Sequence, residues 1–234
     1  MHDSTRKRLP LMNVLGLMLL ASVTALPIAV QAASSARKEF TEALQLRPDL
    51  GHGSELFRAC AKCHGVSGNG ADDGSVPRIA GQHFRVLVRQ LVDYRHETRW
   101  DIRMEHYAGR GLLADSQAIA DVAAYAAQLA RDAPRNVGDG TFVRRGAQVY
   151  AERCAECHGA SGEGEGLTMN PRLAGQHYAY LLRQIYDAVD GRRPNFSVAH
   201  VKILARLDRD DIVGVADFLA RSEWTGPKQV VAAK

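Results

Sequence analysis

The sequence predicts an all-α protein built from two tandem domains, and three observations lead to this prediction. The 34-residue segment from Cys60 to Asp93 recurs from Cys154 to Asp187 with 18 identical residues, so the second half repeats the first. Apolar residues recur at helical spacing at equivalent places in both halves. A chain of 234 residues also has room for two domains of about 100 residues each.

Residues 1–32 have the pattern of a secretory signal peptide. Basic residues at positions 6–8 precede an apolar stretch from Leu11 to Val30, and Val30 and Ala32 supply the small side chains that a signal peptidase recognises. The alternative is an uncleaved membrane anchor, since a spanning helix needs roughly 20 apolar residues. Pro27 and the small residues at the end of the stretch favour cleavage near Ala32 and export of the mature protein.

The charge balance gives no sign of nucleic-acid binding. The chain has 30 basic and 26 acidic residues, and removing the three basic and one acidic residue of positions 1–32 leaves 27 and 25, a net charge of +2. Nucleic-acid binding calls for a concentrated basic face, which this composition lacks. We therefore expect protein partners and no nucleic acid.

The repeat and the loop-forming residues divide the chain. The predicted parts are an N-terminal extension at 33–53, a first domain at 54–133, a linker at 134–140, a second domain at 141–222 and a C-terminal tail at 223–234. The predicted helices cover about 36–46 in the extension, then 54–61, 82–96 and 115–130 in the first domain and 141–155, 176–190 and 208–220 in the second.

Each half contains one C-x-x-C-H motif, and together the two motifs use all four cysteines. They comprise Cys60, Cys63 and His64 in the first half and Cys154, Cys157 and His158 in the second. This spacing is typical of covalent haem attachment, in which both thiols form thioethers and the histidine binds iron. A redox dithiol, half of a zinc site or a disulfide are the alternatives for a single C-x-x-C. Two complete motifs in an exported chain favour two c-type haems.

With these motifs in place, the chain from about Ser54 to Arg221 resembles the dihaem cytochromes c of the cytochrome c4 type. The resemblance rests on two class I cytochrome c patterns in tandem, each with C-x-x-C-H, a downstream P-R-[IL]-A-G-Q-H run and a C-terminal helix. It implies two small helical domains wrapped around one haem each, packed as a pseudo-twofold pair and serving electron transfer in the bacterial periplasm.

The resemblance also implies contacts beyond the iron ligands. The carbonyl groups of Pro77 and Pro171 are expected to accept a hydrogen bond from the proximal histidines, which fixes the imidazole orientation. Arg78 and Arg172 are candidates for pairing with haem propionates, and a solvated surface position is the equal alternative.

At the sixth ligand the sequence departs from the resemblance. Cytochromes of the c4 type place a methionine about seven residues ahead of the leucine that opens the last helix. Counting back seven from Leu113 and Leu207 gives His106 and His200, each 42 residues after its proximal histidine. We therefore expect a bis-histidine iron in both domains, with Met104 as the alternative ligand in the first.

Two protein ligands on each iron predict a carrier of single electrons between redox protein partners in the periplasm, and no enzyme activity. The alternatives are a haem enzyme that oxidises sulfur compounds or reduces peroxide at a displaceable ligand, or the cytochrome subunit of a larger oxidoreductase, including a membrane-associated complex.

Overall fold

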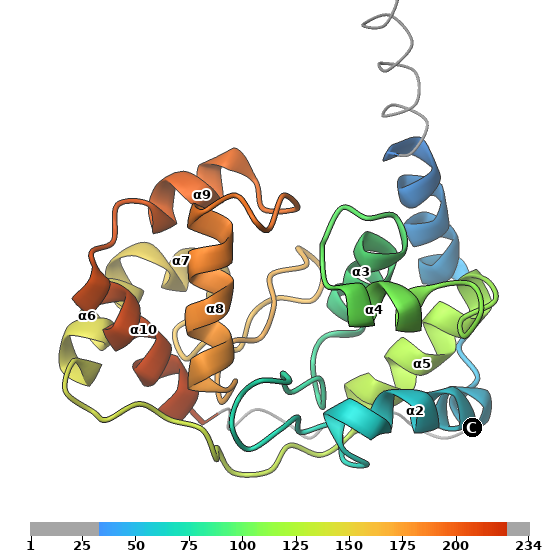
Figure 1. Ribbon diagram of the computed structural model, residues 1–234, viewed down its shortest axis with the longest axis horizontal. Coiled ribbons are helices and arrows are strands. Elements are labelled where there is room, and N and C mark those ends of the chain that lie inside the picture. Colours follow the sequence, from blue (N-terminus) through green and yellow to red (C-terminus); the bar gives the residue numbers. More distant parts are fainter. Residues whose placement is uncertain (1–32, 224–234) are drawn as a thin grey trace, which may run out of the picture.

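The computed structural model describes residues 33–223, and Figure 1 shows two helical domains side by side, joined by an extended linker. Within these residues the only strand-like feature is one antiparallel bridge between Glu165 and Asn170, so the predicted all-α class is confirmed. None of the helices in this range has the length and apolar character to cross a membrane. The predicted signal peptide and nearly all of the predicted tail lie outside the described residues.

The first domain contains four helices, labelled in Figure 1: α2 (Leu50–His64), α3 (Phe84–Arg95), α4 (Ile102–Ala108) and α5 (Ser116–Gln128). Helix α2 packs against α5, and α3 packs against both α4 and α5. The crossing of α2 over α5 depends on Gly53, where an added Cβ would lie 2.2 Å from the carbonyl oxygen of Asp121. The absence of a side chain thus lets the two helix backbones touch.

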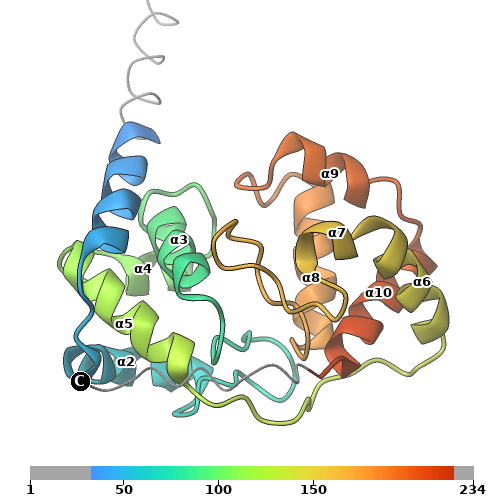
Figure 2. The same cartoon turned by 180° about the vertical axis from the view of Figure 1, so that it is seen from behind.

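The second domain repeats this arrangement with α6 (Val143–Arg153), α7 (Ala155–His158), α8 (Tyr178–Val189), α9 (Val198–Leu204) and α10 (Arg209–Arg221). Helix α6 crosses α10, as seen from behind in Figure 2, and the contact again depends on glycine. A Cβ on Gly146 would lie 2.0 Å from the carbonyl of Gly214. The single helix predicted for 141–155 is interrupted at Cys154, so the second haem motif lies on a separate short helix.

Helices α4 and α9 were not among the predicted helices. Each is only seven residues long, too short for an apolar periodicity to stand out in the sequence. Their starting points are nevertheless encoded locally, because the Asp101 carboxylate accepts bonds from Arg103 N–H and Met104 N–H, and the Ser197 hydroxyl accepts one from His200 N–H.

The N-terminal extension forms a helix over residues 33–45, close to the predicted 36–46. Its Glu39 is 6% exposed and pairs with Arg95, His96 and Arg110 of the first domain, with the His96 Nε2 at 2.7 Å. Hydrogen bonds from these groups outweigh burial and lower the pKa of Glu39. The His96 side chain is only 16% exposed, because it is bonded to this carboxylate.

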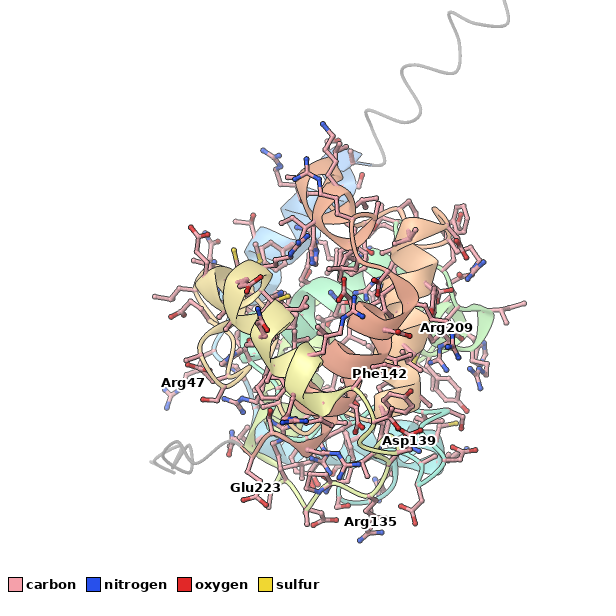
Figure 3. The ribbon with its side chains drawn as sticks, turned by 90° about the vertical axis from the view of Figure 1, so that its left-hand side faces the viewer. Arg47, Arg135, Asp139, Phe142, Arg209 and Glu223 are labelled. Atoms are coloured by element: carbon pink, nitrogen blue, oxygen red, sulfur yellow. The ribbon has the colours of Figure 1, made fainter. Side chains whose placement is uncertain are left out.

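The linker follows the surface and is tied down by one buried carboxylate. Asp217 of α10 is 2% exposed and accepts hydrogen bonds from the backbone N–H groups of Gly138 and Gly140, both at 2.8 Å. Arg135 and Asp139, labelled in Figure 3, are exposed beside this attachment. The linker path is therefore fixed against the second domain.

The two domains meet through a pair of equivalent glutamines. The Gln176 side chain accepts a hydrogen bond from Arg78 N–H and donates one to the Arg78 carbonyl, both at 2.9 Å. Gln82 makes the same two bonds, at the same distances, to the backbone of Arg172. Because Gln82 and Gln176 are equivalent in the repeat, this exchange gives the interface its pseudo-twofold symmetry.

Two histidines reinforce the same interface. His83 Nε2 lies 2.9 Å from the carbonyl oxygen of Glu163, and His177 Nε2 lies 2.8 Å from that of Asn69. Each histidine precedes the first residue of its helix, α3 or α8, and reaches the glycine-rich loop of the opposite domain. The repeated run that ends in Gln-His therefore builds the contact between domains.

Candidate haem sites

The two cysteine pairs lie at the ends of helices α2 and α7, next to the histidines that follow them. All four thiols are unpaired; Cys60 and Cys154 are partly buried, whereas Cys63 and Cys157 are exposed. Burial raises the pKa of Cys60, and likewise of Cys154, to about 11. One cysteine of each pair thus packs against the apolar core of its domain, and the other is exposed.

The Nδ1 atoms of both motif histidines are bonded to backbone carbonyl groups. His64 Nδ1 lies 2.9 Å from the Pro77 carbonyl oxygen, and His158 Nδ1 lies 3.2 Å from that of Pro171, as the family resemblance implies. Burial lowers the pKa of both imidazoles, so they are neutral. Donation from Nδ1–H then leaves the Nε2 lone pair available to a metal.

The proline carbonyls are held in place by glycines of the preceding loop. A Cβ on Gly70 would lie 2.4 Å from the Val76 carbonyl and 2.8 Å from the Pro77 carbonyl, and Gly70 has φ of 79°. Gly164 has the same relation to Pro171, with an added Cβ at 2.6 Å from its carbonyl oxygen. Glycine is therefore needed at this position both for its positive φ and for space beside the bond to the histidine.

In the second domain, His200 of α9 faces the motif histidine. The rings of His158 and His200 have centroids 6.0 Å apart. Two imidazoles that bind one metal from opposite sides, with bonds of about 2.0 Å each, have a comparable spacing of roughly 6 Å. Burial, together with the neighbouring His158 and Arg193, lowers the pKa of His200 to about 4, which keeps its imidazole in the neutral, metal-binding form.

In the first domain, the structure aligns Met104, and not His106, with His200. Met104 is the third residue after the N-cap Asp101, and His200 is the third residue after the N-cap Ser197. Met104 is partly buried, whereas His106 is exposed and lies against Tyr107. The equal spacing of 42 residues therefore does not mark equivalent places in the two helices.

His106 and His200 occupy different places in their helices because the loops before and after α4 and α9 differ in length in opposite directions. The connection from α3 to α4 is two residues shorter than the connection from α8 to α9, and the connection from α4 to α5 is longer than the connection from α9 to α10. Leu113 and Leu207 are both buried and remain in register. Counting back seven residues from Leu113 crosses part of the loop between α4 and α5, and counting back from Leu207 crosses part of the shorter loop between α9 and α10. The same count therefore reaches different places in α4 and α9.

Arg78 and Arg172 are both buried, at 4% and 5% exposure, so the solvated alternative is wrong. The Arg78 guanidinium donates to the carbonyl groups of Gly175, at 2.7 Å, and Ala133. Arg172 donates to the carbonyl of Gly81 in the other domain. Both guanidinium groups therefore donate to a backbone carbonyl of the opposite domain.

The residues present fit one covalently bound haem in each domain. Each domain supplies two unpaired thiols, a neutral imidazole fixed by a carbonyl, and a second helix that carries a candidate metal ligand. Two tandem helical domains with this donor set define a dihaem c-type cytochrome.

Comparison with known proteins agrees with this class. The cytochrome c family model matches residues 51–130 and 143–222. Cytochrome c4 of Pseudomonas aeruginosa is 31% identical over 181 residues, which cover 73% of this chain and 87% of that protein. The chain belongs to the cytochrome c family and, within it, to the dihaem cytochromes of the c4 type.

Two solved structures extend the comparison. Reduced cytochrome c4 from Pseudomonas stutzeri superposes with a TM-score of 0.65 at 26% identity, over 76% of this chain and all of that one. A thiosulfate dehydrogenase from Marichromatium purpuratum gives a TM-score of 0.62 at 30% identity, over 80% of this chain but only 44% of that one. The N-terminal helix at 33–45 lies outside the family match.

Sequence reasoning missed the interface roles of Gln82 and Gln176 and a group of buried polar residues between the domains. The repeat was the available signal, because both glutamines lie in the run that ends at His83 and His177. What was missing was the identity of their partners, which lie in the opposite domain and 90 to 98 residues away in sequence.

Proposed function

We propose that this protein carries single electrons between redox proteins, with one covalently attached haem in each domain. The haem iron supplies reversible one-electron chemistry between Fe(III) and Fe(II). The observation that carries the proposal is the facing pair His158 and His200, whose rings are 6.0 Å apart. If protein side chains hold both axial positions, none is open to a substrate, which favours a carrier over an enzyme.

The protein residues have distinct roles in this proposal. Cys60 and Cys63 form the thioethers in the first domain, and Cys154 and Cys157 form them in the second. His64 and His158 are the proximal ligands, oriented by the carbonyls of Pro77 and Pro171.

The proposed sixth ligands differ between the domains. His200 serves the second haem, and Met104 serves the first, because the two residues share one place in equivalent helices. His106 remains the alternative in the first domain, because it lies on the same short helix, two residues after Met104. Thioether stabilises ferrous iron more than imidazole does, so the first haem is expected to have the higher reduction potential.

Near-infrared magnetic circular dichroism of the ferric protein tests this ligand set, because His/Met and His/His irons have different charge-transfer bands. We expect one haem of each kind. Met104→Leu should remove the His/Met band, and His106→Gln should leave both bands unchanged. Met169→Leu, in a loop of the second domain, is the matched control. Loss of a band in His106→Gln alone would assign the first haem to His106.

Ligand binding separates a carrier from an enzyme. The ferrous wild type should bind carbon monoxide slowly or not at all at both haems, since each sixth position is filled. Fast binding at one haem would show a displaceable ligand and would favour the enzyme alternative, for which the similarity to a thiosulfate dehydrogenase is the supporting observation.

We further propose that the protein works in the periplasm and exchanges electrons there with oxidoreductases, free or membrane-associated. The signal-peptide pattern of residues 1–32 supports this location. N-terminal sequencing of the exported protein would test cleavage near Ala32, and a start at residue 1 would favour a retained anchor.

A further inference from the structure

The N-terminal helix at residues 33–45 is packed into the first domain, although it lies outside the family match. Ala43 is fully buried in the core of that domain, and Phe40 packs against the same core. In Figure 1 and Figure 2 this helix, drawn in blue, lies on the side of the first domain that faces away from the second. Residues 127–139, which correspond to it by the offset of the repeat, run from the end of α5 into the linker. The helix is therefore an addition to the first domain alone.

Glu39 connects this helix to the surroundings of α4. Its carboxylate is buried and forms ion pairs with Arg95, at the end of α3, and with Arg110, in the loop that follows α4. His96 Nε2 lies 2.7 Å from the second carboxylate oxygen. The Arg95 side chain is only 4% exposed, so the carboxylate balances the charge of a buried cation.

Arg95 extends this connection to α4, the helix that carries Met104. Its Nε donates a hydrogen bond to the carbonyl of Ala108, the last residue of α4, at 2.8 Å, and its Nη2 donates one to the carbonyl of Leu113. A carbonyl at the end of a helix has no partner within the helix, and a cation there also interacts favourably with the helix dipole. The end of α4 is therefore held by a guanidinium group whose own partner is the N-terminal helix.

A helix as short as α4 depends on such contacts. It has only seven residues, and isolated helices shorter than about 12–15 residues are marginal in water. Its first turn is capped locally, because the Asp101 carboxylate accepts hydrogen bonds from the N–H groups of Arg103 and Met104. The place of Met104 thus depends on its own N-cap at one end of the helix and on Arg95 at the other.

The second domain has a valine where the first has Arg95. Val189 occupies the equivalent position in the repeat, and its side chain donates no hydrogen bond. The two helices therefore differ in their support as well as in their candidate ligand, which is Met104 on α4 and His200 on α9. A thioether is a softer and weaker ligand of ferric iron than an imidazole. The added support is found in the domain that has the weaker ligand.

We infer that the N-terminal helix positions the sixth ligand of the first haem, through Glu39 and Arg95, and keeps that ligand on the iron. The inference rests on the proposed function, in which Met104 is this ligand. Both charged groups are positioning residues. Without the carboxylate, Arg95 is a buried cation with no anion, so it turns towards water and releases the end of α4. Met104 then dissociates more often, and the sixth position opens to small molecules.

Glu39→Ala in the intact dihaem protein tests this inference. We expect carbon monoxide to bind the first ferrous haem roughly tenfold faster or more, because breaking a buried ion pair shifts an opening equilibrium by at least that factor. The His/Met band of the ferric protein should weaken, and the second haem should keep its wild-type properties.

The reduction potential of the first haem separates positioning from a simple charge effect. Removing a negative charge by itself favours ferrous iron and raises the potential. Loss of the thioether lowers the potential, because the thioether stabilises ferrous iron. We therefore expect the potential of the first haem to fall in Glu39→Ala, and a rise would overturn the inference.

Glu42→Ala is the matched control, because Glu42 lies on the same helix and carries the same charge, but its carboxylate accepts a hydrogen bond from Ser116 of α5, at 3.0 Å. We expect it to keep the wild-type rate of carbon monoxide binding and the His/Met band. Hydrogen exchange adds a readout that does not involve the haem. The amides of α4 should exchange roughly tenfold faster or more in Glu39→Ala than in Glu42→Ala, while those of α2 keep similar rates.

Two results would overturn the inference. One is a Glu39→Ala variant that behaves like Glu42→Ala. The other is an equal loss of protection in α2 and α4, which would show a general loss of stability and no special role for α4.

If Glu39→Ala does not fold, Glu39→Gln decides the matter, because it keeps the side-chain volume and one acceptor oxygen and removes only the charge. It should produce the same changes to a smaller extent, and wild-type values of both carbon monoxide binding and α4 exchange would overturn the inference. The wild type separates the two levels. A ferric wild type without a His/Met band contradicts the proposed ligand set and with it this inference, whereas a wild type with that band and an insensitive Glu39 contradicts this inference alone.

Discussion

Replacing Gln176 by alanine should loosen the docking of the two domains while leaving each domain folded. Gln176 is 7% exposed, and its Oε1 accepts a hydrogen bond from the N–H of His177 in its own domain at 3.0 Å. Its amide also makes two hydrogen bonds across the interface, both 2.9 Å long, to the backbone N–H and carbonyl of Arg78. Neither of these bonds joins two helices of the same domain. Their loss therefore acts on the interface.

The size of the effect follows from the groups left behind. Truncation leaves the N–H and the carbonyl of Arg78 without this partner in a buried place, and an unsatisfied buried group costs about 1–3 kcal/mol. The two together cost about 2–6 kcal/mol, which lowers the ratio of docked to undocked protein by roughly 30-fold to 20,000-fold. Bonds from Gln82 to Arg172 remain, so docking should be weakened and not abolished.

Small-angle X-ray scattering and urea unfolding of the dihaem protein measure this effect. The radius of gyration of Gln176→Ala should rise at low urea concentration, before the haem absorbance of either domain changes. Gln148→Ala is the control, because Gln148 is exposed and bonds only to Glu152. The reasoning is refuted if both variants keep the wild-type radius and their unfolding free energies agree within about 0.5 kcal/mol.

Three further outcomes follow from local contacts. Gly146→Ala should destabilise the second domain by about 3 kcal/mol in urea unfolding, because the added Cβ would lie 2.0 Å from the Gly214 carbonyl. An unchanged urea midpoint would contradict the close crossing of α6 and α10. Asp217→Ala should cost about 2 kcal/mol and expose the linker to limited proteolysis, since the backbone N–H groups of Gly138 and Gly140 lose their acceptor. Wild-type cleavage rates would argue against this attachment. Hydrogen bonding to Asp121 raises the pKa of His52. The stability advantage of wild type over His52→Gln should therefore be complete below the ordinary histidine pKa of about 6.5, and it should disappear as the pH rises through the raised pKa. A constant difference in unfolding free energy from pH 5 to pH 9 would disprove the link.

The haem motifs and the repeat were accessible from the sequence because both are matters of covalent spacing. Cys60, Cys63 and His64 must follow one another at fixed intervals to reach one porphyrin edge and its iron, and this requirement does not depend on the rest of the fold. The three main helices of each domain were also predictable, since their apolar faces recur every three to four residues over at least three turns. The end points differed by a few residues, where capping groups and helix breaks such as the one at Cys154 set the limits.

The equivalence of Met104 with His200 and the contacts between domains depended on the tertiary structure. Met104 and His106 are two residues apart, and only the positions of α4 and α9 in space show which of them matches His200. Arg78 and Arg99 are both arginines with no local signal to tell them apart, yet one bonds to backbone carbonyls and the other shares amide oxygens with Arg193. The physical reason is that hydrogen bonds and charges act over a few ångströms in space, between groups that are up to 108 residues apart along the chain.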